Sequence, residues 1–396
     1  MSVATRSSSR ERALVRIVCV VVFVDTMLFA VIAPLLPGLA HELHLSKLSA
    51  GVLTASYPFG MLVASLPCGV LVARVGPRLT VCIGLALCAA STAAFAVLHN
   101  VAALDLARAV EGVGGACSWG GGMAWIAVDT AVRRRGAMMG YAVAAAIAGG
   151  LFGPVVGTVA TATGRPLAFG VLAAGAAGLI AVVVRLPSSH RPSQQGLRSV
   201  LDACRHADML VGMWLMALPA IASGSVNVLG PLRLHRLGAP AAAIGGTFLC
   251  AAALAAAASP AVGRFSDRHG RIVPLRGGLA VAAVALACFT VPSDVVVLAV
   301  VIVVVSIALA TFWAPTMAML SDAAEAHGLE QGFAAALMNL AWAGGQILGS
   351  ALGGASAKQF GDAFPTAATA VLCLLTFVTV TSMRDLASHS AAPAPE

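Results

Sequence analysis

The stretch GVLVARVG, residues 69–76, returns 194 positions later as GRFSDRHG, residues 263–270. Each copy lies in a short polar connection between the second and third apolar segments of its half of the chain. Pro34 near the end of the first segment likewise has a counterpart in Pro231 of the seventh. A repeat over this distance indicates that the chain is built from two related halves.

Long apolar segments surround both copies. About 20 apolar residues suffice to cross a hydrocarbon core about 30 Å thick. Twelve such segments are expected, at residues 14–38, 50–73, 79–98, 102–128, 136–161, 166–186, 209–232, 239–262, 273–291, 295–319, 331–355 and 364–383. The sequence therefore predicts an all-α integral membrane protein with twelve transmembrane helices in two pseudo-symmetric six-helix bundles.

The longest polar connection divides the segments six and six. We therefore expect a cytoplasmic N-terminal tail at residues 1–13, an N-terminal bundle at 14–186, a cytoplasmic linker at 187–208, a C-terminal bundle at 209–383 and a cytoplasmic C-terminal tail at 384–396. Parallel six-helix halves suggest alternating access around a site at their interface.

Composition and charge agree with a membrane protein. Hydrophobic residues make up 59% of the 396 residues and charged residues 10%, whereas soluble domains carry about 25% charged residues. With the N-terminus in the cytoplasm, eighteen lysines and arginines fall on the inner side and five on the outer side. This asymmetry predicts that both termini are cytoplasmic in an inner or plasma membrane. It also explains the formal charge of +8, so nucleic acid is not an expected partner.

Other readings of the chain find less support. The first apolar run is longer than the apolar region of a secretory signal, so an uncleaved first helix is expected. The nine cysteines show no C-x-x-C spacing, and no H-E-x-x-H, G-x-S-x-G or Walker motif occurs. A membrane-embedded enzyme is therefore disfavoured, and neither a cofactor nor a metal site is expected.

The loop repeat and the twelve-segment layout resemble the major facilitator superfamily over the whole chain. That family's loop signature is G-x-L-x-D-R-x-G-R-[KR]. The first copy matches it at Gly69, Leu71, Arg74, Gly76 and Arg78, and the second keeps Asp267, Arg268, Gly270 and Arg271. Ala73 and Pro77 depart from the signature. Arginine and aspartate of such loops can pair across the inner gate, and the loss of the acid at Ala73 weakens one such pairing. The resemblance implies that these loops gate the inner side; the alternative is that the arginines only obey the charge asymmetry.

The fifth segment carries a second signature. Its glycines and proline match the pattern G(x8)G(x3)GP(x2)G at Gly140, Gly149, Gly153, Pro154 and Gly157, although Thr158 replaces a final glycine. The pattern resembles drug:proton antiporters and implies a closely packed, bendable gating helix. Ordinary small-residue packing is the alternative in a chain with 41 glycines.

Asp25 is a lone carboxylate within the first apolar segment. A charged aspartate near the bilayer centre costs about 2.5 to 3.5 kcal/mol, so such acids usually serve a function. In the fourth segment, Arg108 and Glu111 belong to a stretch that resembles the family's R-x-x-Q-G-x-G-x-A, with glutamate in the glutamine position. Asp25 and Glu111 are predicted at similar depth, and Arg108 lies one turn from Glu111.

Two arrangements of these three groups remain open. If Asp25 faces Arg108 closely, it stays ionised in a structural pair. If Glu111 takes the arginine, Asp25 is free to bind and release a proton. The first segment also resembles that of vesicular amine transporters, whose acid there is a cation or proton site. Ala310 and Asn339 stand where those transporters carry further acids, so a doubly acidic amine site is not expected.

Polar and aromatic residues within apolar segments are candidates for a substrate cavity, and each also has an explanation in packing. They are Met27, Trp119, Trp214, Ser223, Asn227, Trp313, Asn339, Trp342 and Gln346. Together these features predict a monomeric, proton-coupled exporter of a small hydrophobic organic compound, with Asp25, Glu111 and Arg108 in proton coupling. A substrate:proton symporter on the same scaffold is the alternative.

Overall fold

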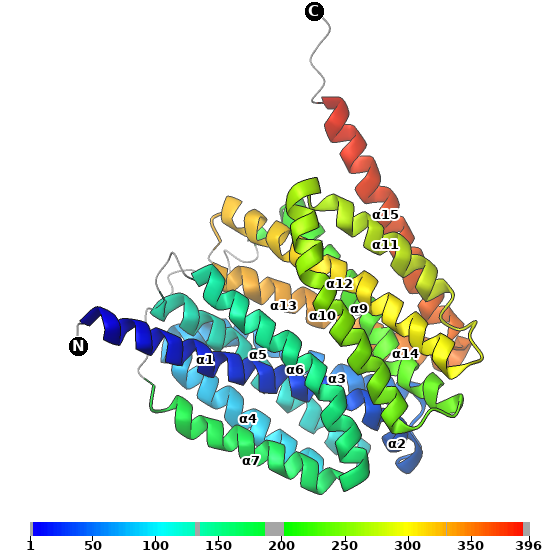
Figure 1. The fold of residues 1–396 in the computed structure, drawn as a ribbon, viewed down its shortest axis with the longest axis horizontal. Helices are drawn as coiled ribbons and strands as arrows, with labels where there is room; N and C mark the ends of the chain where they lie inside the picture. Colours follow the sequence, from blue (N-terminus) through cyan, green and yellow to red (C-terminus); the bar gives the residue numbers. More distant parts are fainter. Residues whose placement is uncertain (1–2, 131–134, 187–201, 330, 391–396) are drawn as a thin grey trace, which may run out of the picture.

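The chain folds into helices joined by short connections (Figure 1). The structure, a computed structural model, describes residues 3–130, 135–186, 202–329 and 331–390, and this part contains no strand. The first bundle contains α1 (Val3–Ala30), α2 (Ile32–Glu42), α3 (Lys47–Val75), α4 (Pro77–Val97), α5 (Val101–Asp129), α6 (Arg135–Thr163) and α7 (Arg165–Val183). The second contains α9 (Ala207–Arg236), α10 (Ala241–His269), α11 (Ile272–Ala287), α12 (Val295–Ala326), α13 (Gln331–Ile347), the π-helix η2 (Leu348–Leu352), α14 (Gly353–Phe360) and α15 (Ala363–Ser390).

These helices form twelve rods, because α1 continues into α2 and α13 continues through η2 into α14. Among the described residues, nine helical stretches are long and apolar enough to cross a membrane. The other three rods are α11, which is short, α5, which carries charges and several glycines, and the rod interrupted by η2. The expected all-α membrane fold with two six-helix bundles is confirmed.

Several helices extend beyond the expected limits, both at the chain ends and within the chain, where α10 ends at His269 and α12 at Ala326. α1 begins at Val3, inside the expected tail, and α15 continues to Ser390. The residues next to the apolar segments have mostly adequate helix propensity. A helix can therefore continue beyond the apolar part of its sequence. Residues 187–201, most of the expected linker, lie outside the described residues.

The sequence repeat is also a repeat of backbone geometry. Gly76 ends α3 with φ 85°, and Gly270 ends α10 with φ 86°. This left-handed region strains residues that have a Cβ atom, so the turn requires glycine in both halves. The same turn therefore joins the second and third rods of each bundle.

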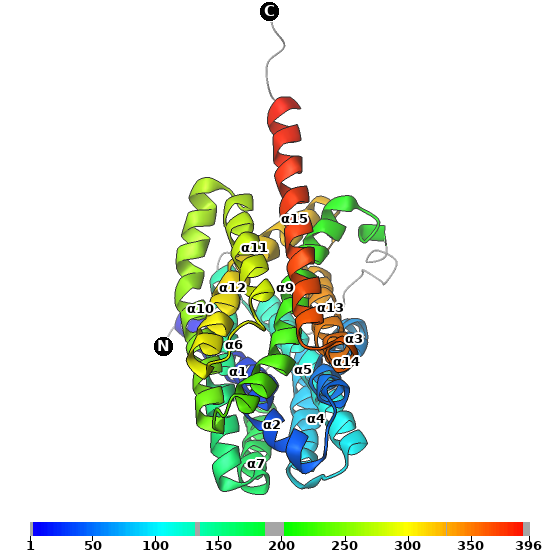
Figure 2. The ribbon, with the colours of Figure 1, turned by 90° about the vertical axis from the view of Figure 1, so that its right-hand side faces the viewer.

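The two bundles diverge toward the chain termini and converge at the opposite end. In Figure 1 the N-terminal end of α1 and the C-terminal end of α15 point in different directions, whereas Figure 2 shows α14 beside α3. Gly51 and Gly354 allow this approach, because a Cβ atom on Gly51 would collide with the carbonyl oxygen of Ser350. A Cβ atom on Gly354 would likewise collide with that of Lys47. We call this region, where residues 47–51 of α3 meet residues 350–362, the closed end.

An ion-pair cluster joins the bundles at the closed end. Nζ of Lys47 lies 2.5 Å from Oδ1 of Asp362 and donates to the carbonyl of Ala357 at 3.4 Å. Arg236 binds the other oxygen of Asp362. Burial raises the pKa of the Asp362 carboxyl, but its hydrogen bonds from Lys47 and Arg236 outweigh that effect and hold the pKa below the ordinary value of 3.8. The carboxylate therefore stays ionised at neutral pH.

Asp362→Asn is expected to loosen the closed end. The amide keeps the shape of the side chain but loses the charge that Lys47 and Arg236 share. Because Arg236 is half exposed and screened by solvent, the loss should be about 1 kcal/mol, or about fivefold in the open population. Hydrogen–deuterium exchange of the amides in α14 and the first turn of α3 should be faster by that factor.

The pH dependence of the same contact follows from the lowered pKa. A carboxyl with a depressed pKa contributes stability above its unfolded value and loses it as pH falls through the folded value. Exchange at α14, corrected for the intrinsic rate, should therefore be constant from about pH 8 to about pH 5 in the wild type.

The control for Asp362→Asn is Asp202→Asn, which alters an exposed pair with Arg205. Equal protection in Asp362→Asn and the wild type would contradict the role of the cluster.

Candidate functional site

The first rod is broken next to its buried acid. Pro34 lacks an N–H, and its ring would clash with the carbonyl of Ala30 in a continuous helix. α1 accordingly ends at Ala30, and α2 begins at Ile32. Asp25 lies about one and a half turns before this break and is only 3% exposed.

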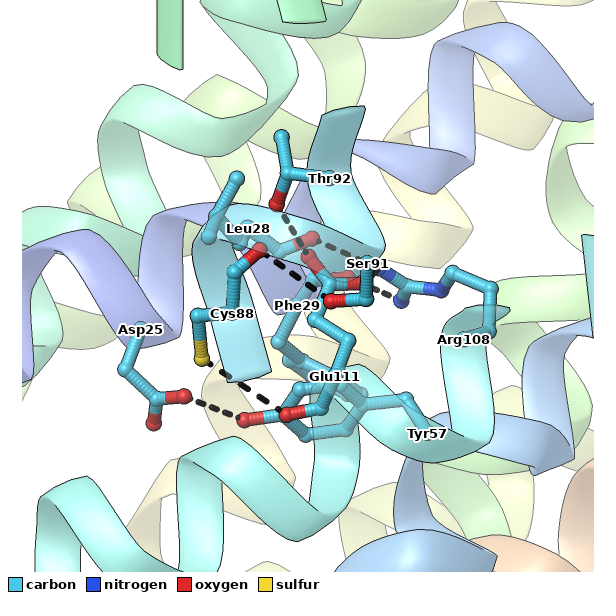
Figure 3. A network of polar contacts seen from close by, with 9 residues as sticks. All are labelled: Asp25, Leu28, Phe29, Tyr57, Cys88, Ser91, Thr92, Arg108 and Glu111. Atoms are coloured by element: carbon cyan, nitrogen blue, oxygen red, sulfur yellow. Dashed lines mark hydrogen bonds and ion pairs between the residues drawn. The ribbon is translucent and has the colours of Figure 1, made fainter. Parts of the chain in front are cut away.

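Asp25 accepts a hydrogen bond from a neighbouring helix. Oη of Tyr57, on α3, donates to Oδ1 of Asp25 at 2.8 Å (Figure 3). Gly115 on α5 lies opposite, and a Cβ atom there would come within 2.6 Å of the same carboxylate oxygen. The carboxylate is thus enclosed by α1, α3 and α5.

Arg108 and Glu111 form a buried ion pair on α5. Nη1 of Arg108 lies 2.6 Å from Oε2 of Glu111, and both residues are at most 3% exposed. Thr92 donates to Oε1 of Glu111 at 3.4 Å. The guanidinium also donates to the carbonyl oxygens of Leu28 at 3.0 Å and Phe29 at 3.3 Å. Arg108 therefore links the break in the first rod to Glu111.

This pairing leaves Asp25 without an ionic partner. Among the described residues, Asp25 forms no salt bridge, and the hydroxyl of Tyr57 is its hydrogen-bond donor. Of the two arrangements that the sequence left open, the structure has the one in which Glu111 takes the arginine. A buried carboxylate with one donor is poorly stabilised in its charged form, so the arrangement favours proton binding.

The glycine pattern of the fifth rod packs α6 against α1. A Cβ atom on Gly153 would come within 2.5 Å of Cβ of Ala30. One on Gly149 would collide with the carbonyl of Phe23, and one on Gly157 with that of Val31. The glycines thus bring α6 into backbone contact with α1 on both sides of Asp25.

Substitutions along this pattern should have unequal effects. Gly153→Ala places a methyl group against Ala30 and should destabilise the protein by about 1 to 3 kcal/mol, as overpacking does. Gly140→Ala is the matched control, because no atom lies within 4 Å of the added methyl group. Thermal unfolding in detergent checks both. Similar losses in the two variants would show that packing against α1 is not the reason for the pattern.

At the other face of α6, the departure from the pattern lies at the bundle interface. A Cβ atom on Gly245 of α10 would collide with the hydroxyl oxygen of Thr158. Thr158 itself donates to the carbonyl of Pro154 at 2.8 Å. A glycine on the facing helix therefore makes room for the residue that replaces the final glycine of the pattern.

The predicted cavity residues fall into two groups. Trp342 on α13 packs edge-on against Phe29 at 5.3 Å, and Met27 on α1 is buried two residues from Asp25. Gln346 donates to Ser223 at 2.9 Å within the second bundle. Asn227 and Asn339 are partly buried on α9 and α13.

The remaining tryptophans lie elsewhere. Trp119 packs against the core of the first bundle around Val18 and Trp125. Trp214 donates to Thr376 between α9 and α15, and Trp313 is 38% exposed on α12. The structure therefore brings Trp342 and Met27 to the region of Asp25. A role of any of these residues in a substrate cavity stays a prediction.

Two of the loop arginines, Arg78 and Arg271, make contacts within their own halves. Arg78 donates to the carbonyl of Leu186 at 2.9 Å, beyond the end of α7. Arg271 pairs with Asp322 of α12 at 2.6 Å. Arg74 and Arg268 are exposed, Gly69 lies near Phe333, and the side chain of Asp267 lies outside the described residues. The gating role of these loops stays a prediction.

Tyr57, Phe29 and Thr92 complete the site and were not among the residues selected from the sequence. Tyr57 is one of two tyrosines in the chain. A single phenol within an apolar segment is a signal that could have identified it, since buried hydroxyls need partners. Phe29 and Thr92 carry no such signal, because phenylalanine and threonine are common in apolar segments.

A family model and a solved structure each match nearly the whole chain. The family model "Major Facilitator Superfamily" matches residues 18–235 and 209–395. A solved bacterial homolog of the human lysosomal transporter Spinster, in an inward-facing and unoccupied conformation, superposes with a TM-score of 0.72 over 98% of this chain and 99% of that one. The two share 14% sequence identity, so this likeness concerns the fold alone.

Two curated relatives are similar over part of the chain. Probable vesicular acetylcholine transporters B and A of Danio rerio are each 32% identical, over 151 and 145 residues. These matches cover 36% and 31% of this chain, and 31% and 28% of the relatives. The chain thus aligns with less than a third of either relative.

Proposed function

Because the chain belongs to the Major Facilitator Superfamily, we propose that it exports a small hydrophobic organic compound in exchange for protons that bind Asp25. The family makes the chain a multi-pass membrane transporter of small molecules and not an enzyme. The proposal adds the coupling ion, the direction and the kind of substrate.

The observation that carries the proposal is the unpaired state of Asp25. Burial makes the bare carboxylate costly, while Arg108 is already bound to Glu111. The site is therefore most stable when Asp25 holds either a proton or a substrate. If proton and substrate cannot occupy Asp25 at the same time, the binding of one requires the release of the other. Their movements across the membrane are then coupled.

The surroundings of Asp25 support an apolar substrate with few polar groups. The rings of Phe29, Tyr57 and Trp342 lie in contact near the acid. Aromatic faces accept flat apolar compounds and also organic cations. The glycine contacts of α6 along α1 support the antiport direction, because this pattern resembles that of antiporters.

Transport in proteoliposomes tests the proposal. Vesicles are loaded with ethidium, a hydrophobic fluorescent cation, or with other dyes and antibiotics, and the outside is made acidic. Antiport predicts that the inward proton gradient accelerates dye efflux. An uncoupler, which dissipates the gradient, should return efflux to the rate measured without a gradient. Dye accumulation in vesicles driven by the same gradient would instead indicate symport. Equal efflux with and without a gradient would refute proton coupling.

A further inference from the structure

Tyr57 touches both charged parts of the site. It is 1% exposed, and its hydroxyl donates to Asp25 at 2.8 Å. The guanidinium carbon of Arg108 lies 5.2 Å from the centre of its ring, in the range of a cation–π contact. The phenol therefore contacts the acid through its oxygen and the arginine through the face of its ring (Figure 3).

Glycines of α5 hold Tyr57 in this place. A Cβ atom on Gly115 would collide with Oη of Tyr57, and one on Gly112 would collide with its backbone oxygen. α5 is thus fitted around the residue at two points. These contacts hold the phenol with its oxygen at the carboxylate of Asp25.

The ring of Tyr57 also leads to the second bundle. It lies 5.2 Å from the ring of Phe29, which lies 5.3 Å from the ring of Trp342. Phe29 belongs to α1 and Trp342 to α13, so the last contact crosses between the bundles. Asp25, Tyr57, Phe29 and Trp342 form a continuous row of touching side chains.

We propose that Tyr57 is the positioning residue that couples the charge of Asp25 to the contact between the bundles. The inference rests on the proposed function. A hydrogen bond to a carboxylate is about twice as strong as one between neutral groups. Protonation of Asp25 therefore weakens its hydrogen bond with Tyr57. The phenol is then held less firmly, which weakens the ring contacts that lead through Phe29 to Trp342. The ionised acid, in turn, stabilises the contact between Phe29 and Trp342.

The other groups around Asp25 are fixed within the site. Arg108 and Glu111 face it from α5 and are paired with each other, and Cys88 faces it from α4. α6 meets α1 through the uncharged Gly149 and Gly153. Tyr57 is thus the group whose hydrogen bond depends directly on the charge of Asp25.

The experiment follows the protonation of Asp25 without any ligand. The C=O stretch of the protonated carboxyl is recorded by infrared difference spectroscopy of the full-length protein in lipid as pH is varied, and Asp25→Asn assigns the band. In Tyr57→Phe the carboxylate loses its donor, so the titration midpoint should move upward by about one pH unit, a tenfold change in proton affinity. Tyr141→Phe, which removes the other phenol hydroxyl from an exposed position on α6, is the matched control.

A second variant tests the link to the bundle contact. Coupling between two sites is reciprocal, so Trp342→Leu should move the midpoint in the same direction by about twofold to threefold in affinity. An unchanged midpoint in Tyr57→Phe overturns the positioning role, and an unchanged midpoint in Trp342→Leu overturns the coupling. If the wild type shows no titrating Asp25 band, the proposed function itself fails, which separates the two failures.

Discussion

Asp25→Asn is expected to abolish gradient-driven efflux and to leave the fold intact. Asparagine has the same shape and still offers an oxygen to the hydroxyl of Tyr57, 2.8 Å away in the wild type. It cannot take up a proton, so the carrier no longer alternates between a charged and a neutral site. Dye efflux from proteoliposomes under an inward proton gradient should fall to the rate of liposomes without protein.

Two further variants serve as controls for this result. Asp25→Glu keeps an ionisable group and should retain part of the gradient-driven efflux. Asp202→Asn removes an exposed acid that pairs with Arg205, and it should transport like the wild type. Gradient-driven efflux at the wild-type rate in Asp25→Asn would reject this residue as the coupling group.

Arg108→Met is expected to cause the largest loss of stability. It leaves Glu111 buried without its counter-charge and removes the donors to the carbonyls of Leu28 and Phe29. Truncation of one member of a buried pair costs about 3 to 5 kcal/mol, because the remaining charge is uncompensated. Unfolding of the purified protein in mixed micelles measures the loss.

The double variant separates pairing from simple packing. In Arg108→Met/Glu111→Met both charges of the pair are removed, so neither is left buried without its partner and most of the lost stability should return. The carbonyls beside the break still lack their donors, and the double variant should therefore stay somewhat less stable than the wild type. If the losses in Arg108→Met and Glu111→Met simply add in the double variant, the two residues do not act as a pair.

The fold could be predicted from the sequence because its determinants are local. Apolar stretches of sufficient length give the helices, and the repeated loop gives the two halves. Gly76 and Gly270 show why the repeat is informative: both turns need a positive φ. The partial match at Ala73 does not alter the turn, because Gly76 and Gly270 have nearly the same φ.

The site could be predicted only in part. The buried Asp25 stands out in an apolar segment, and the spacing of Arg108 and Glu111 places them on one helix face. Which of the two acids binds the arginine depends on how α1 and α5 pack, and the sequence left this open. The closed-end cluster could not be predicted, because Lys47 and Asp362 lie 315 residues apart. Their meeting depends on the approach of the bundles at Gly51 and Gly354.

Proton release on substrate binding tests the central claim most directly. Purified protein in weakly buffered detergent solution, at a pH where the infrared band shows Asp25 protonated, receives the dye that gave the largest gradient-driven flux. A pH indicator then counts the released protons. Exchange at Asp25 predicts about one proton for each bound dye molecule in the wild type and none in Asp25→Asn. Dye binding without proton release in the wild type, or equal release from Asp25→Asn, would contradict it.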